Sequence, residues 1–344
     1  MRYMENIKPG HNLGGWFDRF NCNGNLNYYV NQVNVNLFSK PREVMLFSAN
    51  SMSGTIFTPL AGYALEQGSE IFGKLGNPVG VSCYKPFHSH DEDFLHNYVG
   101  MLGIPLEPAP QFPDKADMVF LTASAAADPG IIDKLKAHLA KGKNAVITSG
   151  LLDTLKDKGI DELAQIRLTN RRVDLHRFSF FGYHLSANGV FLAADSIRIP
   201  VLEYATNDSW PMINGLGEDS NFPLLLQTEY GRGALFVLAV PDDPGMLYRL
   251  PREVLGLLRQ VLGYGMKVTI DAESRIALFT YDNDTFVVES FLPYDTTIDI
   301  IVNHRAARLV NLPSERVLEG CSRGNQTEIS VNLPAQTYRA FRIQ

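Results

Sequence analysis

Residues 116–150 carry the clearest structural pattern in the chain, with the sequence ADMVFLTASAAADPGIIDKLKAHLAKGKNAVITSG. An apolar run, MVFL, leads into a polar loop and then into a segment where Ile132, Leu135 and Leu139 recur at helical spacing. Gly142 follows, where a helix is expected to end, and a second apolar run, AVIT, comes next. This order predicts two parallel strands joined by a right-handed helical crossover.

The same alternation of strands and helices extends in both directions. Upstream, NPVGVSCYK at 77–85 predicts a strand, and DEDFLHNYVGMLG at 91–103 predicts a helix. Downstream, LLLQTEYGRGALFVLAV at 224–240 predicts a hairpin, and LPREVLGLLRQVLGYG at 250–265 predicts a closing helix. We therefore expect residues 68–265 to form an α/β domain built on a parallel sheet flanked by helices.

The two ends of the chain have different patterns. Residues 1–67 predict a helix at LNYYVNQVNVNLFSK, 26–40, and a buried strand at REVMLFSA, 42–49. One helix and one strand cannot bury their apolar faces alone, so this extension is expected to dock on other structure. Residues 266–344 alternate polar and apolar positions, as in RIALFTYDNDTFVVESF, and predict a C-terminal antiparallel β-sandwich.

Composition excludes several classes of protein. The 344 residues are 45% hydrophobic and 20% charged, with a net charge of −6, which is typical of a soluble globular protein. Scattered Lys and Arg argue against nucleic acid as a partner, and no apolar run reaches the length of a membrane helix. The N-terminus lacks the apolar core of a signal peptide, which leaves the compartment open.

Cofactor and metal signatures are missing from the sequence. Its three cysteines, Cys22, Cys83 and Cys321, form neither a disulfide framework nor a zinc pattern. No dinucleotide, P-loop, zinc-protease or nucleophile-elbow motif occurs in a supporting strand–turn–helix context. The sequence therefore predicts no cofactor and no metal.

The segment CYKPFHSHDED, residues 83–93, admits a functional interpretation. It follows a predicted strand, and ligands of open α/β sheets favour the carboxyl ends of strands. A Cys83 thiolate near His88 could act as a nucleophile, and His88 and His90 with an aspartate could hold a metal. Asp128, which follows the next strand, would join the same crevice.

A structural interpretation explains more of the same segment, and we favour it. Ser89 and Glu92 stand at the S-x-x-E spacing of a capping box, directly before the apolar face of the predicted helix. Asp91, Glu92 and Asp93 would then fill the first helical turn, where the helix dipole favours anions. His88 and His90 would be ordinary loop residues.

Two further loops contain candidate residues. TNDSWP, at 206–211, places Asp208 beside Trp210, a combination that suits sugar binding but also occurs where one Trp anchors a polar loop. AVPDDPG, at 239–245, places Asp242 and Asp243 after a strand, where they could serve as acid and base. Since Asp-Pro favours turns, we interpret these two aspartates as turn residues.

The stretch 116–150 resembles the glutamine-amidotransferase-like, flavodoxin-like domain that follows the catalytic barrel in some glycoside hydrolases. The closest pattern is the β-galactosidase family with a barrel, a trimerisation domain and a small β-domain. YGRGALFVLAVPDDPGMLYRLPREVLGLLRQVL resembles the closing hairpin and helix of that domain, and VNLPAQTYRAFRI is similar to the C-terminal domain. The resemblance implies that residues 1–67 are the last part of a barrel, and that the middle domain, 68–265, self-associates into a homo-oligomer.

The chemistry of that family is not matched residue by residue. Class I amidotransferases carry a nucleophilic Cys where this chain has TASAAADPG, so no triad is carried over. Glycosidases use two carboxylates on barrel strands, and Glu43, which precedes its strand, is a poor candidate for one. We expect a non-catalytic accessory or oligomerisation part of a glycoside-hydrolase-type protein, with carbohydrate as a partner.

Two alternative functions remain open. One is an independent hydrolase that uses the strand-end crevice near Cys83, His88, His90 and Asp128. The other is a carbohydrate-binding module that uses Asp208 and Trp210. The exposure and the contacts of these side chains in the structure would distinguish the two alternatives.

Overall fold

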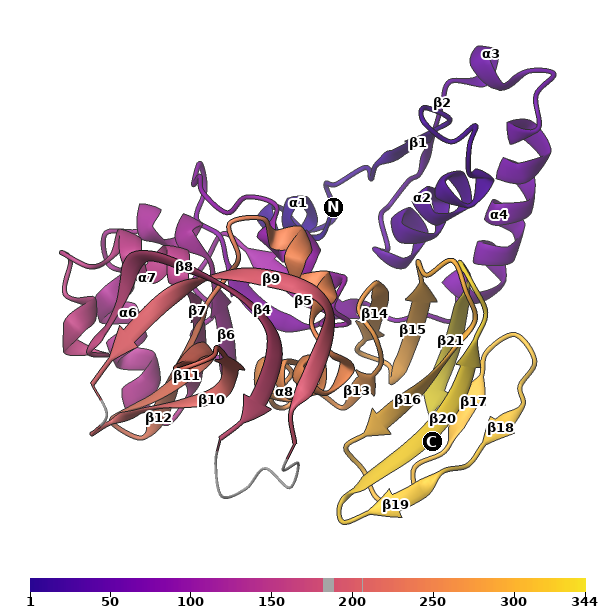
Figure 1. The fold of residues 1–344 in the computed structure, drawn as a ribbon. Helices are drawn as coiled ribbons and strands as arrows, with labels where there is room; N and C mark the ends of the chain where they lie inside the picture. The colour runs from indigo at the N-terminus through magenta and orange to yellow at the C-terminus, as the bar shows by residue number, and fades with distance from the viewer. Residues whose placement is uncertain (182–188, 206) are drawn as a thin grey trace. The chain divides into compact units, whose positions relative to one another are not determined.

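The computed structural model describes residues 1–181, 189–205 and 207–344 (Figure 1). Contacts between residues divide the chain into two compact units: Val81–Gly265 alone, and Met1–Gly80 together with Met266–Gln344. The expected strand at 77–85 is two strands, since Pro78–Val79 (β3) pairs in the second unit and Val81–Tyr84 (β4) pairs in the first. The three-domain division at 67 and 265 stays a prediction.

The unit Val81–Gly265 is built on a nine-stranded mixed sheet in the order β5-β4-β6-β7-β12-β11-β10-β8-β9. Strands from β5 to β12 in this order pair in parallel, and the remaining strands pair antiparallel. This confirms the predicted α/β fold class. The strands of this sheet, besides β4, are Leu106–Ala109 (β5), Met118–Leu121 (β6), Asn144–Thr148 (β7), Ile166–Phe180 (β8), Phe191–Tyr204 (β9), Ser209–Leu216 (β10), Asn221–Tyr230 (β11) and Gly233–Leu238 (β12).

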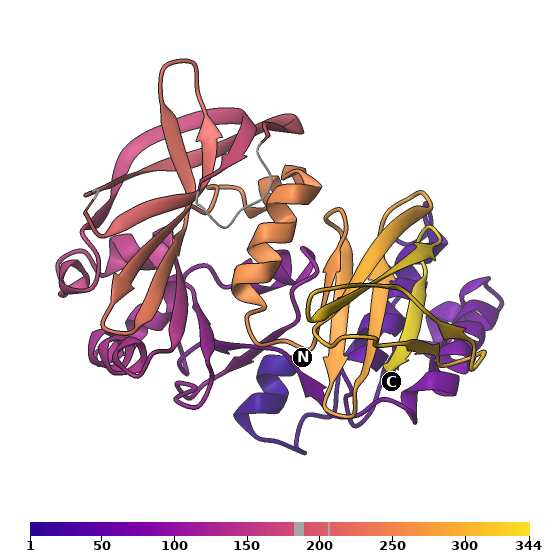
Figure 2. The same cartoon turned by 90° about the horizontal axis from the view of Figure 1, so that it is seen from below.

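Helices cover both faces of the parallel strands. Ile131–Ala140 (α6) and Ser149–Thr154 (α7) lie on one face, and Arg252–Leu262 (α8) lies on the other (Figures 1 and 2). The predicted helices of α6 and α8 are confirmed, with Leu135, Leu139 and Leu258 buried as their spacing requires. Shorter helices are Leu95–Gly100 (α5) and the 3₁₀ segments Ala123–Ala127 (η1), Ile160–Glu162 (η2) and Pro244–Arg249 (η3).

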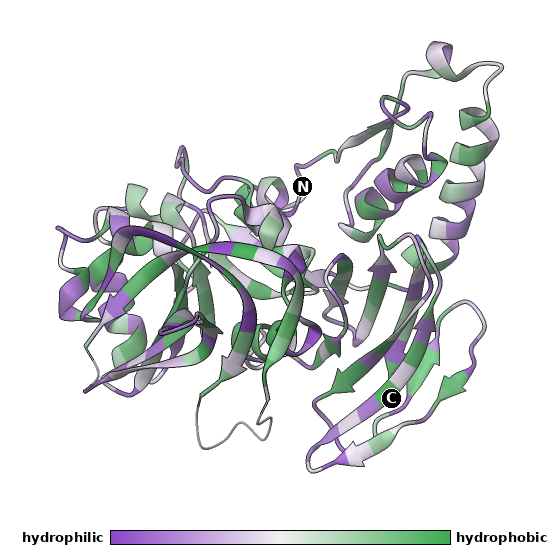
Figure 3. Cartoon of the chain, viewed as in Figure 1, coloured by the Kyte–Doolittle hydropathy of each residue, from purple (hydrophilic) through white to green (hydrophobic). Residues whose placement is uncertain are grey.

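Burial explains which strands the sequence reveals most readily. All four residues of β6 are buried, and so are the last four of β7, since parallel strands are covered on both faces. Strand β8, by contrast, is largely hydrophilic (Figure 3), and most of its side chains are partly or fully exposed. The predicted hairpin at 224–240 is confirmed as β11 and β12, with Gly231 in the left-handed conformation that its turn requires.

The C-terminal residues form two antiparallel sheets that share one apolar core, which confirms the predicted β-sandwich. The sheets have the orders β13-β16-β20-β19 and β18-β17-β21-β15-β14-β3. Their strands, besides β3, are Val268–Asp271 (β13), Ile276–Tyr281 (β14), Thr285–Ser290 (β15), Thr296–Val302 (β16), Leu309–Asn311 (β17), Val317–Leu318 (β18), Cys321–Arg323 (β19), Gln326–Leu333 (β20) and Tyr338–Ile343 (β21).

The N-terminal segment packs on the outer face of the six-stranded sheet. Tyr29, Val33 and Leu37 of the predicted helix, found as Leu26–Phe38 (α2), share a core with Val287 of β15 and Ala340 of β21. A second helix in this segment, Phe57–Phe72 (α4), was not predicted. The remaining elements are Arg2–Ile7 (α1), Trp16–Asp18 (β1), Met45–Phe47 (β2) and Ala49–Met52 (α3).

One expectation for this segment is wrong. The apolar run MLF at 45–47 does form a strand, β2, but all three residues are exposed, whereas the sequence predicted a buried strand. The reason is that β2 pairs in parallel only with β1, so the described residues provide no layer over its two faces.

Candidate functional site

A half-buried carboxylate, that of Glu92, lies at the carboxyl ends of two central parallel strands. Oε2 of Glu92 accepts a hydrogen bond from the Ala123 amide, just after β6, at 2.6 Å, and from Oγ1 of Thr148, the last residue of β7, at 2.7 Å. This is the edge of the sheet at which open α/β folds bind their ligands. Glu92 is therefore the centre of the candidate site.

Backbone conformation, rather than a helix cap, directs Glu92 inward. The backbone is left-handed at His88, Asp91 and Glu92, with φ of 54°, 72° and 49°. The capping box predicted for Ser89 and Glu92 is therefore wrong. Helix α5 begins only at Leu95, and Ser89 Oγ donates to the Pro86 carbonyl at 2.6 Å.

The three acidic residues of the segment thus separate. Asp91 is exposed, Glu92 turns toward the strand ends, and Asp93 forms an ion pair with Lys85 at 2.6 Å. Asp93 carries a pKa below its ordinary value, because the Lys85 ammonium donates to its carboxylate. The predicted first helical turn filled with anions does not form, since none of these residues belongs to α5.

Burial dominates the electrostatics of Glu92. Desolvation raises the pKa of its carboxyl, and the hydrogen bonds from Ala123 and Thr148 offset only part of that rise. Space for the carboxylate exists because residue 150 is Gly, where an added Cβ would lie 2.4 Å from Glu92 Oε1. The Ala123 amide and the Thr148 hydroxyl at this strand edge therefore have Glu92 as their acceptor.

A second polar network lies on the neighbouring strands and includes the predicted residue Asp128. Its Oδ2 accepts hydrogen bonds from the Tyr84 hydroxyl at 2.8 Å and from Lys134, and Oδ1 accepts from the Gly130 amide at 2.9 Å. Burial opposes ionisation, but the bonds from Lys134, Tyr84 and Gly130 outweigh it and lower the pKa of Asp128. Asp128 is thus a fixed anion that anchors the loop after β6.

Cys83 lacks the features of a nucleophilic thiol. The residue is fully buried on β4, and its Sγ contacts the Val81 carbonyl at 3.3 Å. Burial raises its pKa well above the ordinary value, which disfavours the nucleophilic thiolate. His88 and His90 are exposed, and no hydrogen bond joins either to Cys83 within the described parts of the chain.

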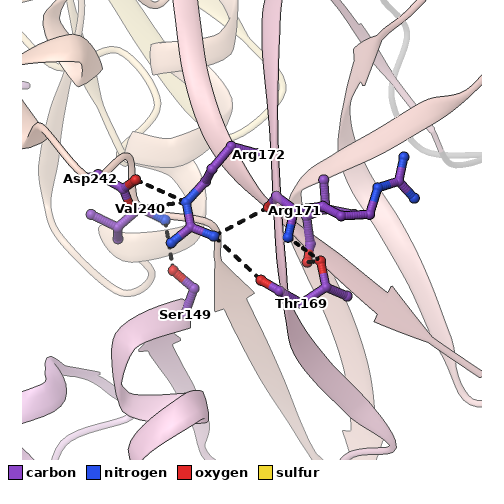
Figure 4. A network of polar contacts seen from close by, with 7 residues as sticks. Ser149, Thr169, Arg171, Arg172, Val240 and Asp242 are labelled. Carbon is purple, nitrogen blue, oxygen red and sulfur yellow. Dashed lines mark hydrogen bonds and ion pairs between the residues drawn. The ribbon is translucent and has the colours of Figure 1, made fainter.

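Asp242 and Asp243 point to different partners. Asp242 pairs with Nε of Arg172, with contacts of 2.9 and 3.1 Å, as Figure 4 shows. This ion pair ties β8 to the loop after β12, and within β8 Arg172 also donates to the Thr169 carbonyl at 3.3 Å (Figure 4). Asp243 caps η3 by accepting from the Gly245 amide at 2.9 Å, as a turn residue does.

Asp208 and Trp210 are neighbours along the chain with separate environments. Asp208 is exposed, and its Oδ1 accepts from the Ser209 hydroxyl at 3.1 Å, whereas Trp210 is half-buried in β10 opposite Gln227. Asp208 thus serves the turn before β10, and Trp210 takes a position within that strand. The predicted sugar-binding role of the pair stays a prediction.

Sequence reasoning did not find the centre of the site. It placed Glu92 in a helix cap and did not consider Tyr84, Lys85, Lys134 or Thr148. One sequence signal could have located the site: Tyr84, Thr148 and Asp128 lie at or after the ends of predicted strands, where polar side chains converge. In the described ranges, no group of three or more His, Cys, Asp or Glu residues could hold a metal ion, and no helix is long and apolar enough to cross a membrane.

Three successive stretches of the chain match models of protein families, and two of these models are described as domains of probable glycosyl hydrolases. Residues 1–75 match a model described as probable glycosyl hydrolase, catalytic domain, and residues 267–343 match probable glycosyl hydrolase, C-terminal domain. Residues 76–243 match a model described as uncharacterized protein SSO3021, second domain. No curated protein matches the chain in sequence.

Solved structures of two β-galactosidases are similar in fold to this chain. Gan42B, a GH42 β-galactosidase from G. stearothermophilus, is similar with a TM-score of 0.54 and 11% identity, over 92% of this chain and 50% of that one. A β-galactosidase from Bacillus circulans sp. alkalophilus is similar with a TM-score of 0.50 and 12% identity, over 90% and 51%. The chain thus spans about half the length of these enzymes, and the likeness concerns the fold alone.

Proposed function

We propose that this chain is a non-catalytic accessory and assembly part of a glycoside-hydrolase-type protein that processes carbohydrate. One observation carries the proposal: the Glu92 carboxylate lies at the carboxyl ends of β6 and β7 and takes the Ala123 amide and the Thr148 hydroxyl as its donors. In an enzyme that used this crevice, such donors would face the substrate.

Among the described residues around Glu92, the nearby serines are not placed as activated nucleophiles. The loop after β6 is Ala123-Ser124-Ala125, and the buried Ser124 hydroxyl bonds the Thr122 hydroxyl at 2.8 Å rather than a general base. Ser149, the first residue of α7, accepts from the Val240 amide at 3.0 Å (Figure 4). These serines serve the fold of the loops.

The match of residues 1–75 to a catalytic-domain model supports the glycoside-hydrolase part of the proposal. In this segment β1 and β2 form a two-stranded parallel sheet joined through α2, which is the repeating unit of a (β/α) barrel. Glycosidase chemistry needs two carboxylates held across the scissile bond, normally on several barrel strands. We propose that such strands lie outside this chain and that copies of the chain associate through the middle domain.

The experiment is a screen of the purified chain on aryl-glycosides and aryl-esters, beside a GH42 β-galactosidase as positive control. We expect no turnover above the buffer blank from protein shown to be folded by circular dichroism. Turnover that falls at least tenfold in Glu92→Gln or Asp128→Asn would overturn the proposal, since it would place chemistry in the crevice. Light scattering of the same sample should give a mass above 38.3 kDa, and a monomer would remove the assembly role.

A further inference from the structure

A fully buried carboxyl group lies where the N-terminal helices meet the C-terminal sandwich. Glu289 is in β15 and has no solvent exposure, and neither of its oxygens completes a hydrogen bond among the described residues. A buried acceptor left without a donor is costly, and a buried charge costs far more. Such a group needs an explanation that the proposed function does not provide.

The alternation of β15 fixes the direction in which Glu289 points. Phe286 and Val288 belong to the core of the sandwich, whereas Val287 belongs to the core that β15 shares with α2 and α4. Since successive side chains alternate between the two faces of a strand, Glu289 lies on the face of Val287, toward the helices. It therefore belongs to the contact that attaches the N-terminal segment to the sheet.

The groups around Glu289 provide no compensating positive charge. Its neighbours across the sheet are Ala277 of β14 and Tyr338 of β21, and the Asn34 amide faces it from α2. From α4, Glu70 and Tyr63 act on Tyr338, whose pKa is raised to about 12 by burial and then by Glu70 and Glu289. Arg342, which by alternation shares this face of β21 with Tyr338 and Ala340, pairs instead with Glu315 at 3.7 Å, so none of these groups stabilises an ionised Glu289.

We propose that Glu289 is a protonation-dependent clasp, which holds helix α2 against the six-stranded sheet when its carboxyl is neutral and loosens that contact when it ionises. A neutral carboxyl gains an O–H donor, which it can offer to the Asn34 carbonyl oxygen. Ionisation removes that donor and leaves a buried charge that only the Asn34 amide partly stabilises.

The pH range in which the contact of α2 weakens follows from the burial of Glu289. Burial raises the pKa of Glu289 from its ordinary 4.5 to about 8, against the smaller opposing effect of Asn34. A raised acid pKa means that the docked state binds a proton that the open state has lost, so docking weakens as pH rises between these two values. Each pH unit in this range changes the opening constant by up to about tenfold.

Hydrogen exchange read by mass spectrometry tests the clasp on the whole chain. Protection factors of α2 amides, corrected for the intrinsic pH dependence of exchange, are compared with those of β16 in the inner sheet from pH 5 to 9. We expect the protection of α2 relative to β16 to fall by up to about tenfold per pH unit, and then to level off near pH 8.

Two variants separate this clasp from a general effect of alkali. Glu289→Gln cannot ionise and should keep α2 protection constant across the range. If the Gln variant does not fold, Glu289→Met, which also cannot ionise, takes its place and should give the same result. Glu66→Gln, an exposed carboxylate on α4, should behave as the wild type does. Constant α2 protection in the wild type, or an equal fall in the Gln and Met variants, would overturn the proposal.

Discussion

Glu92 and Gly150 are complementary: the carboxylate of one fills the space that a side chain at the other would occupy. A Cβ built on Gly150 lies 2.4 Å from Oε1 of Glu92 and 2.8 Å from its carboxyl carbon. These residues come from the loop after β4 and the start of α7, and the Thr148 hydroxyl donates to Glu92 and accepts from the amide of Leu151, the residue after Gly150. The side chains that positions 92 and 150 can carry therefore depend on one another.

Gly150→Ala should destabilise the protein by about 1–3 kcal/mol, because the new methyl group must displace a hydrogen-bonded carboxylate. Unfolding in urea at pH 7 measures this free energy. In a Glu92→Ala background the same substitution should cost less by at least about 0.5 kcal/mol, since the obstacle is gone. Strictly additive effects of the two substitutions would show that Glu92 does not occupy this space.

Glu92→Gln should make stability less dependent on pH. The pKa of Glu92 is raised by burial, so its contribution is fully present below its unfolded value and is lost as pH rises through the folded one. The amide keeps an acceptor for Ala123 and cannot ionise. We expect the variant to gain stability relative to the wild type from pH 5 to pH 8, measured by thermal unfolding, with Glu66→Gln as the exposed control. A constant difference over this range would contradict the expectation.

Asp128→Asn should act in the opposite direction. The pKa of Asp128 is lowered by hydrogen bonds from Lys134, Tyr84 and Gly130 that outweigh burial, so its contribution is present at neutral pH and is lost as pH falls through the folded value. We expect a loss of about 1.5–3 kcal/mol at pH 7, because the charged hydrogen bonds are weakened. The loss should shrink toward pH 3, and an equal loss at both pH values would refute this account.

The sequence predicted the layered fold well because its determinants are local and repetitive. Strands β6 and β7 are continuous apolar runs, and α6 and α8 place leucines at helical spacing, so the pattern alone identifies them. The split of the strand at 77–85 was not visible, since Gly80 is one residue in an apolar stretch and its role follows from pairing with distant strands.

The candidate site was harder to predict because contacts distant in sequence override a local rule there. S-x-x-E at Ser89 and Glu92 is a valid capping pattern, but the amide of Ala123 and the hydroxyl of Thr148 offer Glu92 better donors 31 and 56 residues away. Left-handed backbone at Asp91 and Glu92 then prevents the first helical turn. Similarly, nothing near Glu289 in the sequence indicates that α2 will cover it.

Thiol labelling tests the exclusion of Cys83 from chemistry. Cys22 and Cys83 are buried free thiols and Cys321 is exposed, so the native protein should react with a small disulfide reagent at one thiol, and at three in denaturant. Cys321→Ser should remove the fast reaction, whereas Cys83→Ser should leave it unchanged. Since a nucleophilic thiol needs access and a lowered pKa, a fast native reaction assigned to Cys83 by mass spectrometry would return this residue to the list of catalytic candidates.

Asp242→Asn should have a small effect on stability. The Asp242 side chain is 65% exposed, and its partner Arg172 keeps the Thr169 and Arg171 carbonyls as acceptors when the carboxylate is replaced. Exposed ion pairs contribute up to about 1 kcal/mol, so we expect a loss within that range in urea unfolding at low salt, and a smaller one at high salt. Arg172→Ala, which also removes the contacts with both carbonyls, is the matched comparison and should cost more. A loss above about 2 kcal/mol in Asp242→Asn that salt does not reduce would mean that the pair is structurally central to the junction of β8 with the loop after β12.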